Sequence, residues 1–414
     1  ALLGNMNATL RLYYDNAYLT EFTAQVVAIS ERAGHPALAL DRSAFYPEGG
    51  GQPADRGWLH GAAAERRWEV VDVQSDNGVV WHLLAAGESP PAVGAAITGQ
   101  IDWARRFDHM QQHCGQHILT AAFIATCDAP TVSFHLSERS VTIDLAVAEL
   151  SEEQARAAEA WANAAVWRNV PVQARFVSPE ELAQIPLRKP PVVSGAVRVV
   201  SIGDIDHSAC GGTHPARSGE VGAIAVLGWS RQRGMIRVEF ACGGRVIAAL
   251  RERDAAARAA AAALSVGWAE LPAAVTRLQE AQQALQRELA QTQRELDALR
   301  AAQWYAQTPP INGRRIVTAT LPMAGVERLR AIANFIAELP DGIAIVAGGE
   351  ERVQVVVACH PDTNADARDI LAAGMAVLGG RGGGNARMAQ GGGGQAGALA
   401  AAIAAMAERA SHHS

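Results

Sequence analysis

Two pairs of potential metal ligands, separated by roughly a hundred residues, constrain the fold of this chain more than any other feature of its sequence. His113 and His117 stand four residues apart in a segment of helical spacing, so their imidazoles share one face of a helix. Cys210 and His214 follow much later, on either side of two glycines that allow the backbone to turn tightly. Neutral imidazoles and a thiolate are usual zinc ligands, so the pattern predicts a Zn²⁺ site that brings both segments together.

The second pair is what favours a metal site. An isolated histidine pair is more often a surface or core feature than a pair of ligands, whereas the stretch Cys-Gly-Gly-Thr-His at 210–214 supplies the completing residues. We expect the histidine helix to have its N-cap at Asp108.

The hydrophobic pattern predicts an α+β protein of four parts. Residues 6–100 contain short alternating runs separated by turn residues, which is typical of a small β-barrel-like domain. Residues 101–242 combine the histidine helix with an antiparallel sheet, and we expect a strand at 196–202 to deliver the second ligand pair at its exit. A strand pair at 131–136 and 140–145 and a helix from Ser151 are also expected there.

The second half of the chain changes character. Residues 243–306 are helical, and a leucine stripe predicts either a coiled-coil dimer seam or an intramolecular helical hairpin. Residues 307–414 alternate strands and helices, which predicts an α/β module. A glycine run at 379–394 precedes its last helix, and such a run is either a phosphate-binding loop or a flexible one.

Composition limits the partners. The chain has 414 residues, 49% of them hydrophobic and 19% charged, and no apolar run reaches membrane-spanning length. The formal charge of −6 argues against indiscriminate nucleic-acid binding, so an RNA partner would be held by local arginine patches. Five scattered cysteines favour a reducing, cytoplasmic setting.

These motifs together resemble one family. The ligand pairs resemble the editing domain of alanyl-tRNA synthetases and the AlaX trans-editing proteins. Residues 45–53, followed by Asp55 and Gly57, are similar to the glycine motif of the longer AlaX proteins, and Ser-Phe-His at 133–135 also resembles that family. The glycine run resembles that of the DHH-associated domain that ends alanyl-tRNA synthetases, and the resemblance covers roughly residues 6 to 400.

The resemblance implies a zinc-dependent deacylase that cleaves the ester of tRNA(Ala) mischarged with serine or glycine. The four ligands would also be the catalytic residues, and His109 would lie outside the ligand set. Six residues would form the substrate pocket: Cys114, where the family usually has threonine, Gln116, Thr131, Ser133, His135 and Thr213. Ten would bind tRNA: Gly49, Gly50, Gly51, Gln52, Arg105, Arg106, Arg188, Lys189, Arg381 and Arg387. A homodimer would form through the helical segment or the C-terminal domain.

Other functions stay open at this point. A zinc-stabilised tRNA-binding protein without catalysis, or a fragment related to the alanine–tRNA ligase, would share the motifs. Four protein ligands are typical of a closed structural zinc, whereas a catalytic zinc keeps one position for water. Either His214 is displaced, or the metal only orients the substrate while a tRNA hydroxyl places the attacking water.

Overall fold

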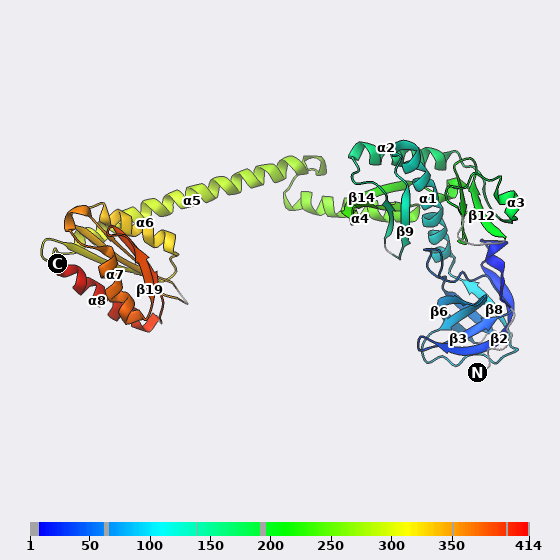
Figure 1. The fold of residues 1–414 in the computed structure, drawn as a ribbon, viewed down its shortest axis with the longest axis horizontal. Helices are drawn as coiled ribbons and strands as arrows, with labels where there is room; N and C mark the ends of the chain where they lie inside the picture. The colour runs from blue at the N-terminus through cyan, green and yellow to red at the C-terminus, as the bar shows by residue number, and fades with distance from the viewer. Residues whose placement is uncertain are drawn as a thin grey trace. The chain divides into compact units, whose positions relative to one another are not determined.

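The fold is described from a computed structural model, for residues 8–61, 66–138, 140–190, 196–349, 352–394 and 396–412. The predicted domain ends at residues 6–7 and 413–414 lie outside these ranges. The chain divides into two compact units, Ala1–Ala259 and Ala260–Ser414, and each mixes helices with sheets, which confirms the α+β class (Figure 1).

The first unit begins with the predicted barrel, which closes in the strand order β2-β3-β7-β6-β5-β8. In β8 and the first half of β2 every second residue is buried, and these residues face a core that includes Phe22, Leu38 and Leu59. Asn77 and Gly78 both have positive φ, which suits the tight hairpin between β6 and β7. The strands are β2 Glu21–Arg32, β3 His35–Leu40, β5 Gly57–Gly61, β6 Arg67–Asp76, β7 Val79–Leu84 and β8 Ala96–Ile101, with the short pair β1 Leu10–Arg11 and β4 Arg42–Ser43 beside them.

The histidine helix is α1, Trp103–Cys127. Its N-cap is Asp102, whose side chain accepts a hydrogen bond from the backbone N–H of Arg105. The prediction of Asp108 as the cap was wrong, because Asp108 lies inside the helix and forms an ion pair with Arg245. The cap at Asp102 adds a full turn before the first histidine.

Two sheets, rather than the single predicted one, surround α1. The four-stranded sheet runs β14-β15-β10-β9, and the three-stranded sheet runs β11-β12-β13. The strand pair and the helix expected from Ser151 are present as β9, β10 and α2, and Ser151 caps α2. The bounds are β9 Thr131–Leu136, β10 Val141–Leu145, α2 Glu152–Trp167, β11 Val172–Val177, α3 Pro179–Leu182, β12 Val197–Ile202, β13 Asp206–Ala209, β14 Ile224–Gln232 and β15 Met235–Cys242. The second ligand pair leaves β13, one strand later than predicted, because the turn after β12 returns the chain along the sheet.

The helical segment contains α4, Gly244–Ala263, and α5, Leu271–Gln307. The leucine stripe of α5 is exposed, including Leu278, Leu285 and Leu289. No single helix in the described ranges is long and apolar enough to cross a membrane; α4 and the helix from Trp268 to Gln307 meet the length and composition criteria only when taken together.

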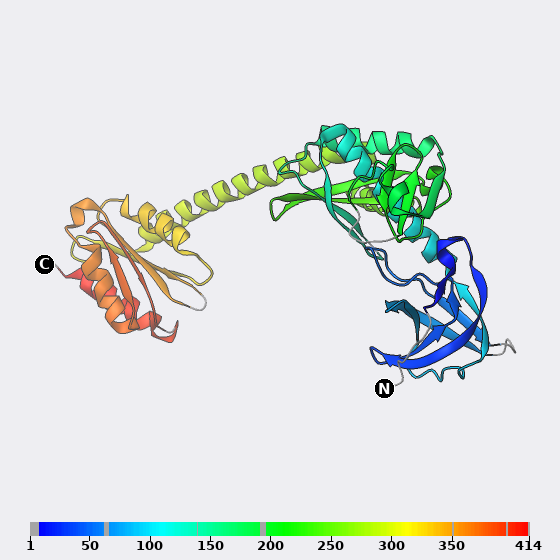
Figure 2. The ribbon, with the colours of Figure 1, turned by 45° about the vertical axis from the view of Figure 1, so that its right-hand side comes forward.

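The second unit contains the predicted α/β module, a sheet ordered β16-β17-β18-β20-β19 between layers of helices (Figure 2). Its elements are β16 Arg315–Leu321, α6 Val326–Ala337, β17 Gly342–Gly348, β18 Gln354–Cys359, α7 Ala367–Leu378, β19 Arg381–Gly384, β20 Met388–Gly392 and α8 Leu399–Ser411. The prediction of the glycine run as a loop was wrong for most of its length. The run forms β19 and β20, because β18 offers an edge on which these residues pair.

Candidate metal centre

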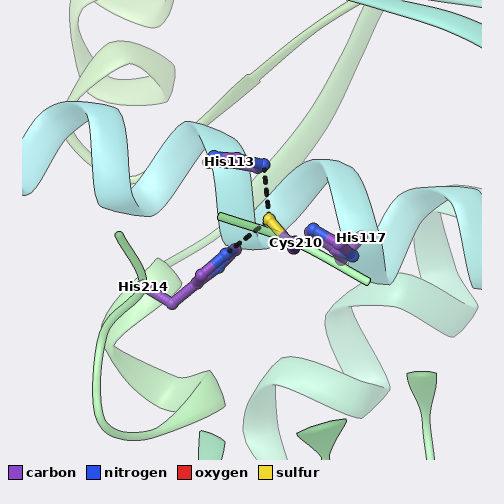
Figure 3. Close-up of side chains that lie close together, drawn as sticks. All are labelled: His113, His117, Cys210 and His214. Carbon is purple, nitrogen blue, oxygen red and sulfur yellow. Dashed lines mark hydrogen bonds between the residues drawn. The ribbon is translucent and has the colours of Figure 1, made fainter. Parts of the chain in front are cut away.

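The four predicted ligands converge on one point. His113 and His117 project from consecutive turns of α1, and Cys210 and His214 come from the turn that follows β13 (Figure 3). One ligand atom from each lies within 4.8 Å of the others. The Cys210 sulfur is 3.4 Å from His113 Nε2 and 3.3 Å from His214 Nε2. All three imidazoles are nearly buried, and Cys210 is partly open to solvent.

Gln52 fixes the tautomer of His113. The Gln52 side chain accepts a hydrogen bond from the backbone N–H of Thr213 at 3.1 Å, so the atom facing that N–H is the amide oxygen. The same oxygen lies 2.9 Å from His113 Nδ1, which must therefore carry a proton and donate it. Nε2 of His113 is left with a free lone pair directed at Cys210, as a metal ligand requires.

Asp206 orients His117 in the same way. Its carboxylate accepts a hydrogen bond from His117 Nδ1 at 2.8 Å and is itself held by Arg188 at 3.0 Å and by Ser208 at 2.9 Å. His117 Nε2 is buried and has no hydrogen-bond partner. A buried nitrogen without a partner, next to a thiol, fits a metal ion that completes its coordination.

The electrostatics of the cluster favour a thiolate. Burial works against ionisation of Cys210, but the neighbouring His113 and His214 hold its pKa well below the ordinary value. Burial alone would lower the pKa of His117, yet its hydrogen bond to Asp206 and the neighbouring Cys210 sulfur outweigh burial and raise that pKa to about 9. Burial lowers the pKa of His214 to about 3. An anionic sulfur among imidazoles is a donor set that zinc prefers.

The turn that carries Cys210 and His214 is fixed by hydrogen bonds from Arg198 and by close packing against His113. Arg198 donates to the carbonyl oxygens of Cys210 and Gly212, at 2.9 and 2.8 Å. A Cβ atom at Gly212 would lie 2.3 Å from His113 Cε1, so only glycine lets the turn approach α1 this closely. His214 is the least supported ligand, because its Nδ1 is buried without a partner.

Comparison with known proteins relates the whole chain to one group. Residues 6–105 match the model of class II (A) tRNA synthetases, and residues 197–239 match the threonyl and alanyl tRNA synthetase second additional domain. The alanyl-tRNA editing protein AlaX-L of Pyrococcus horikoshii is 35% identical over 58% of this chain and 60% of its own length. The chain is related to alanyl-tRNA synthetases and to AlaX-type editing proteins.

Other relatives are longer than this chain. The alanine–tRNA ligases of Methanothrix thermoacetophila and Halorubrum lacusprofundi are each 34% identical, over 95% and 94% of the chain but 44% and 42% of their own lengths. The chain therefore spans less than half of these ligases. The match to the C-Ala domain of Aquifex aeolicus alanyl-tRNA synthetase covers 26% of this chain and 99% of the C-Ala chain, at 20% sequence identity. Its TM-score is 0.25, which decides nothing about the fold.

The predicted pocket residues separate into buried and open ones. Cys114 and Thr213 are fully buried, Cys114 in the hydrophobic core and Thr213 against Gln52, so neither is a wall of an open pocket as predicted. Burial also raises the pKa of the Cys114 thiol. Gln116 donates to Thr120, whose hydroxyl meets that of Thr131 at 2.9 Å, all three buried.

The remaining two pocket candidates lie on β9. Ser133 donates to Asp144 at 2.5 Å, and His135 is exposed, 3.9 Å from the same carboxylate. A role for Gln116, Thr131, Ser133 and His135 in substrate binding stays a prediction.

Two of the predicted tRNA-binding residues are buried. Gln52 is only 1% exposed and its amide is fully engaged at the metal centre. Arg106 and Asp55 are both 0% exposed and form an ion pair, so the guanidinium holds α1 against the barrel instead of meeting a phosphate. Each side chain finds its partner inside the protein, and contact of either one with tRNA stays a prediction.

The other candidates keep some exposure. Gly51 belongs to the open loop 49–51 and packs on Phe134, where a Cβ atom would lie 3.0 Å from the ring. Arg105 pairs with Glu138, Arg188 pairs with Asp206, and Lys189 donates to the carbonyl of Thr131. Arg381 and Arg387 are exposed in the C-terminal unit. Their contacts with tRNA stay predictions.

Asp206 and Arg198 were not predicted as site residues from the sequence. Neither belongs to a recognisable motif, and each acts only through a residue brought to it by the fold. His109, expected outside the ligand set, is buried away from the cluster, and burial lowers its pKa to about 4.

Proposed function

We propose that the chain is a trans-editing hydrolase that deacylates tRNA(Ala) mischarged with serine or glycine. The convergence of three imidazoles and one thiolate on a single point carries the proposal, together with the relation to AlaX-L. Water attacks the carbonyl carbon of the ester, the bond to the ribose oxygen breaks, and the products are the free amino acid and tRNA. We place the protein in the cytoplasm with its substrate.

The chain's own residues divide the work. His113, His117 and Cys210 hold the metal, with Gln52 and Asp206 fixing the two imidazoles. Zinc, when bound, would act as a Lewis acid and lower the pKa of a coordinated water towards about 7. A nearly buried cluster strengthens each electrostatic interaction with the ester.

His214 decides between two forms of this mechanism. Its unpartnered Nδ1 makes it the ligand with the weakest support, so we propose that it yields its position to water or substrate. If His113, His117, Cys210 and His214 all hold the metal, it would only orient the substrate's amino group, and a tRNA hydroxyl would place the water.

The test compares zinc content with Ser-tRNA(Ala) deacylation in three variants. Cys210→Ala should lose zinc and activity, because it removes the only anionic ligand. Cys127→Ala is a matched control from outside the cluster and should keep both. His214→Ala should keep most of its zinc but change the rate of turnover. Retained activity in zinc-free protein would sink the metal-dependent mechanism, and full zinc loss in the His214 variant would show a required fourth ligand.

A second function has one observation in its favour. Alanine–tRNA ligases match 92–95% of the chain, against 58% for AlaX-L, so the same chemistry would also serve as the editing part of a ligase. Multiple turnovers of free Ser-tRNA(Ala) by this chain alone support action in trans; release of less than one equivalent does not. A chain that binds tRNA but never deacylates it would be a zinc-stabilised binding protein.

A further inference from the structure

An exposed aromatic side chain stands beside the metal centre without a role in it. Phe176, near the end of β11, is 55% exposed, although Val172 and Ala174 on the same face of the strand are partly buried and pack on the core. The ring therefore extends beyond the region that the core covers. Covering an exposed phenyl ring with a partner is favourable by roughly 25 cal/mol for each Å² of apolar surface removed from water.

The register of the three-stranded sheet places Phe176 in the same cross-strand row as the candidate ligand Cys210. Phe176 is directly opposite Arg198 across the β11–β12 pair, so both side chains lie on the same face. Arg198 is in turn opposite the start of the ligand turn, because its carbonyl accepts the backbone N–H of Cys210 at 3.0 Å. Two strand spacings separate Phe176 from Cys210, a distance of about 10 Å.

A second ring and two cations complete the surface. The Tyr14 ring meets Phe176 edge to face, with centroids 5.4 Å apart. The guanidinium of Arg198 lies 5.0 Å from the Tyr14 centroid and that of Arg11 lies 5.8 Å from it. We call Tyr14, Phe176, Arg11 and Arg198 the aromatic platform.

The cations of the platform have no acidic partners. Among the described residues, neither Arg11 nor Arg198 forms an ion pair with a carboxylate. Arg198 is 8% exposed, and its Nε is buried without a hydrogen-bond partner. Arg198 donates to two backbone carbonyls and Arg11 to the hydroxyls of Tyr14 and Ser75, so neither positive charge is neutralised. An aromatic face next to guanidinium groups without a carboxylate partner is the combination with which proteins bind a nucleobase and its phosphate.

We infer that the aromatic platform seats the terminal nucleoside of the tRNA substrate, with its base stacked on Phe176 and its phosphate beside Arg11. This rests on the proposed function, since that function requires the ester on the terminal ribose to reach the metal. The base and the ester of the substrate are attached to one ribose. A single aminoacyl nucleoside therefore bridges the roughly 10 Å between the backbones of Phe176 and Cys210. Stacking tolerates any base, so the platform positions the end of the tRNA without reading its sequence.

Binding tests the platform without any need for hydrolysis. The probe is a labelled acceptor-stem RNA hairpin that ends in its normal terminal adenosine, compared with one whose terminal nucleotide is abasic, both with the full chain. Wild type should bind the normal end roughly 5- to 150-fold more tightly, as expected for one stacked base. Phe176→Ala should abolish that ratio, whereas Phe176→Tyr should preserve it.

Trp167→Ala is the matched control, because Trp167 is 77% exposed on α2 and is outside the platform. Its ratio should equal that of wild type, and zinc content and circular dichroism should be unchanged in every variant. Equal affinity of wild type for the two hairpins overturns the platform, and so does an unchanged ratio in Phe176→Ala.

The kcat/KM for deacylation distinguishes failure of the platform from failure of the proposed function. If the chain deacylates Ser-tRNA(Ala), Phe176→Ala should lower kcat/KM by a factor similar to the binding ratio; wild-type kcat/KM in that variant overturns the platform and leaves the deacylase standing. If the chain does not deacylate, the proposed function fails, and the hairpin ratio alone then upholds or overturns the platform.

Discussion

Replacing Gln52 is the sharpest perturbation of the metal centre, because it changes no ligand. The side chain forms three hydrogen bonds, with His113 Nδ1 at 2.9 Å, with the Thr213 N–H at 3.1 Å and with the Thr213 hydroxyl at 2.8 Å. In Gln52→Ala these three buried groups lose their partner, at about 1–3 kcal/mol each, so the free energy of unfolding should fall by about 3 kcal/mol or more. Loss of such an outer partner typically weakens metal binding by about 10- to 100-fold.

The assay measures zinc affinity by competition with a chelator of known strength, beside urea unfolding of the metal-free protein. Gln52→Glu is the informative second variant, because a carboxylate still accepts from His113 Nδ1 and from the Thr213 N–H, and the Thr213 hydroxyl, which accepts from the Gln52 amide, can turn to donate to it. It should bind zinc at least as tightly as wild type. Gln100→Ala, which removes an exposed glutamine from the same barrel, is the control for glutamine loss in general.

Either of two results would refute the role given to Gln52. If Gln52→Ala binds zinc with wild-type affinity, His113 does not need its outer partner, and the hydrogen bond from His113 Nδ1 to Gln52 does not contribute to metal binding. If Gln52→Glu loses zinc as severely as Gln52→Ala, hydrogen bonding is not what Gln52 contributes.

Three further predictions follow from buried or exposed groups elsewhere. Burial lowers the pKa of His82 to about 4, so as the pH falls the unfolded chain binds a proton at this histidine before the folded chain does. The free energy of unfolding should therefore be unaffected by His82 above about pH 6.5 and be about 2 kcal/mol lower at pH 5. In urea titrations at several pH values, His82→Gln should remove this pH dependence. Arg106→Met leaves Asp55 buried and unpaired, and should lower the free energy of unfolding by about 3–5 kcal/mol. Changing Leu285 and Leu289 to glutamine should convert a dimer into a monomer in light scattering, since both are exposed on α5.

Each of these has a clear contrary outcome. Equal pH slopes in wild type and the His82 variant would show that other groups set the acid response. A loss below 1 kcal/mol for Arg106→Met would mean that water reaches Asp55. A wild-type chain that is already monomeric ends the dimer seam on α5.

The sequence predicts what depends on local spacing. Prediction of the four candidate ligands needed only the helical period and the behaviour of a Cys-Gly-Gly turn, and the strand pair at 131–145 needed only alternation. The choice between Asp102 and Asp108 as the cap could not be made locally, because both are aspartates before apolar residues. Asp108 forms an ion pair with Arg245, which lies 137 residues away, and Asp102 is the N-cap.

Buried polar side chains were the least predictable. Gln52 and Arg106 stand in a glycine motif and a basic pair, where exposure is the usual expectation. Their partners lie 61 and 51 residues away, and the barrel must close before either contact exists. The β13 strand was missed for a similar reason, since its four residues match a turn as well as a strand.

The attachment of Gln52 to His113 has a consequence for how the protein is made. The barrel precedes α1 in the chain, and α1 precedes the Cys210 turn, so the segment that carries Gln52 can fold before the anionic ligand is synthesised. A metal ion bound at the candidate site would then complete a structure whose earlier parts are already in place. A nascent chain with a defective barrel would reach Cys210 without the Gln52 oxygen that orients His113, so the candidate metal site would lack one oriented imidazole.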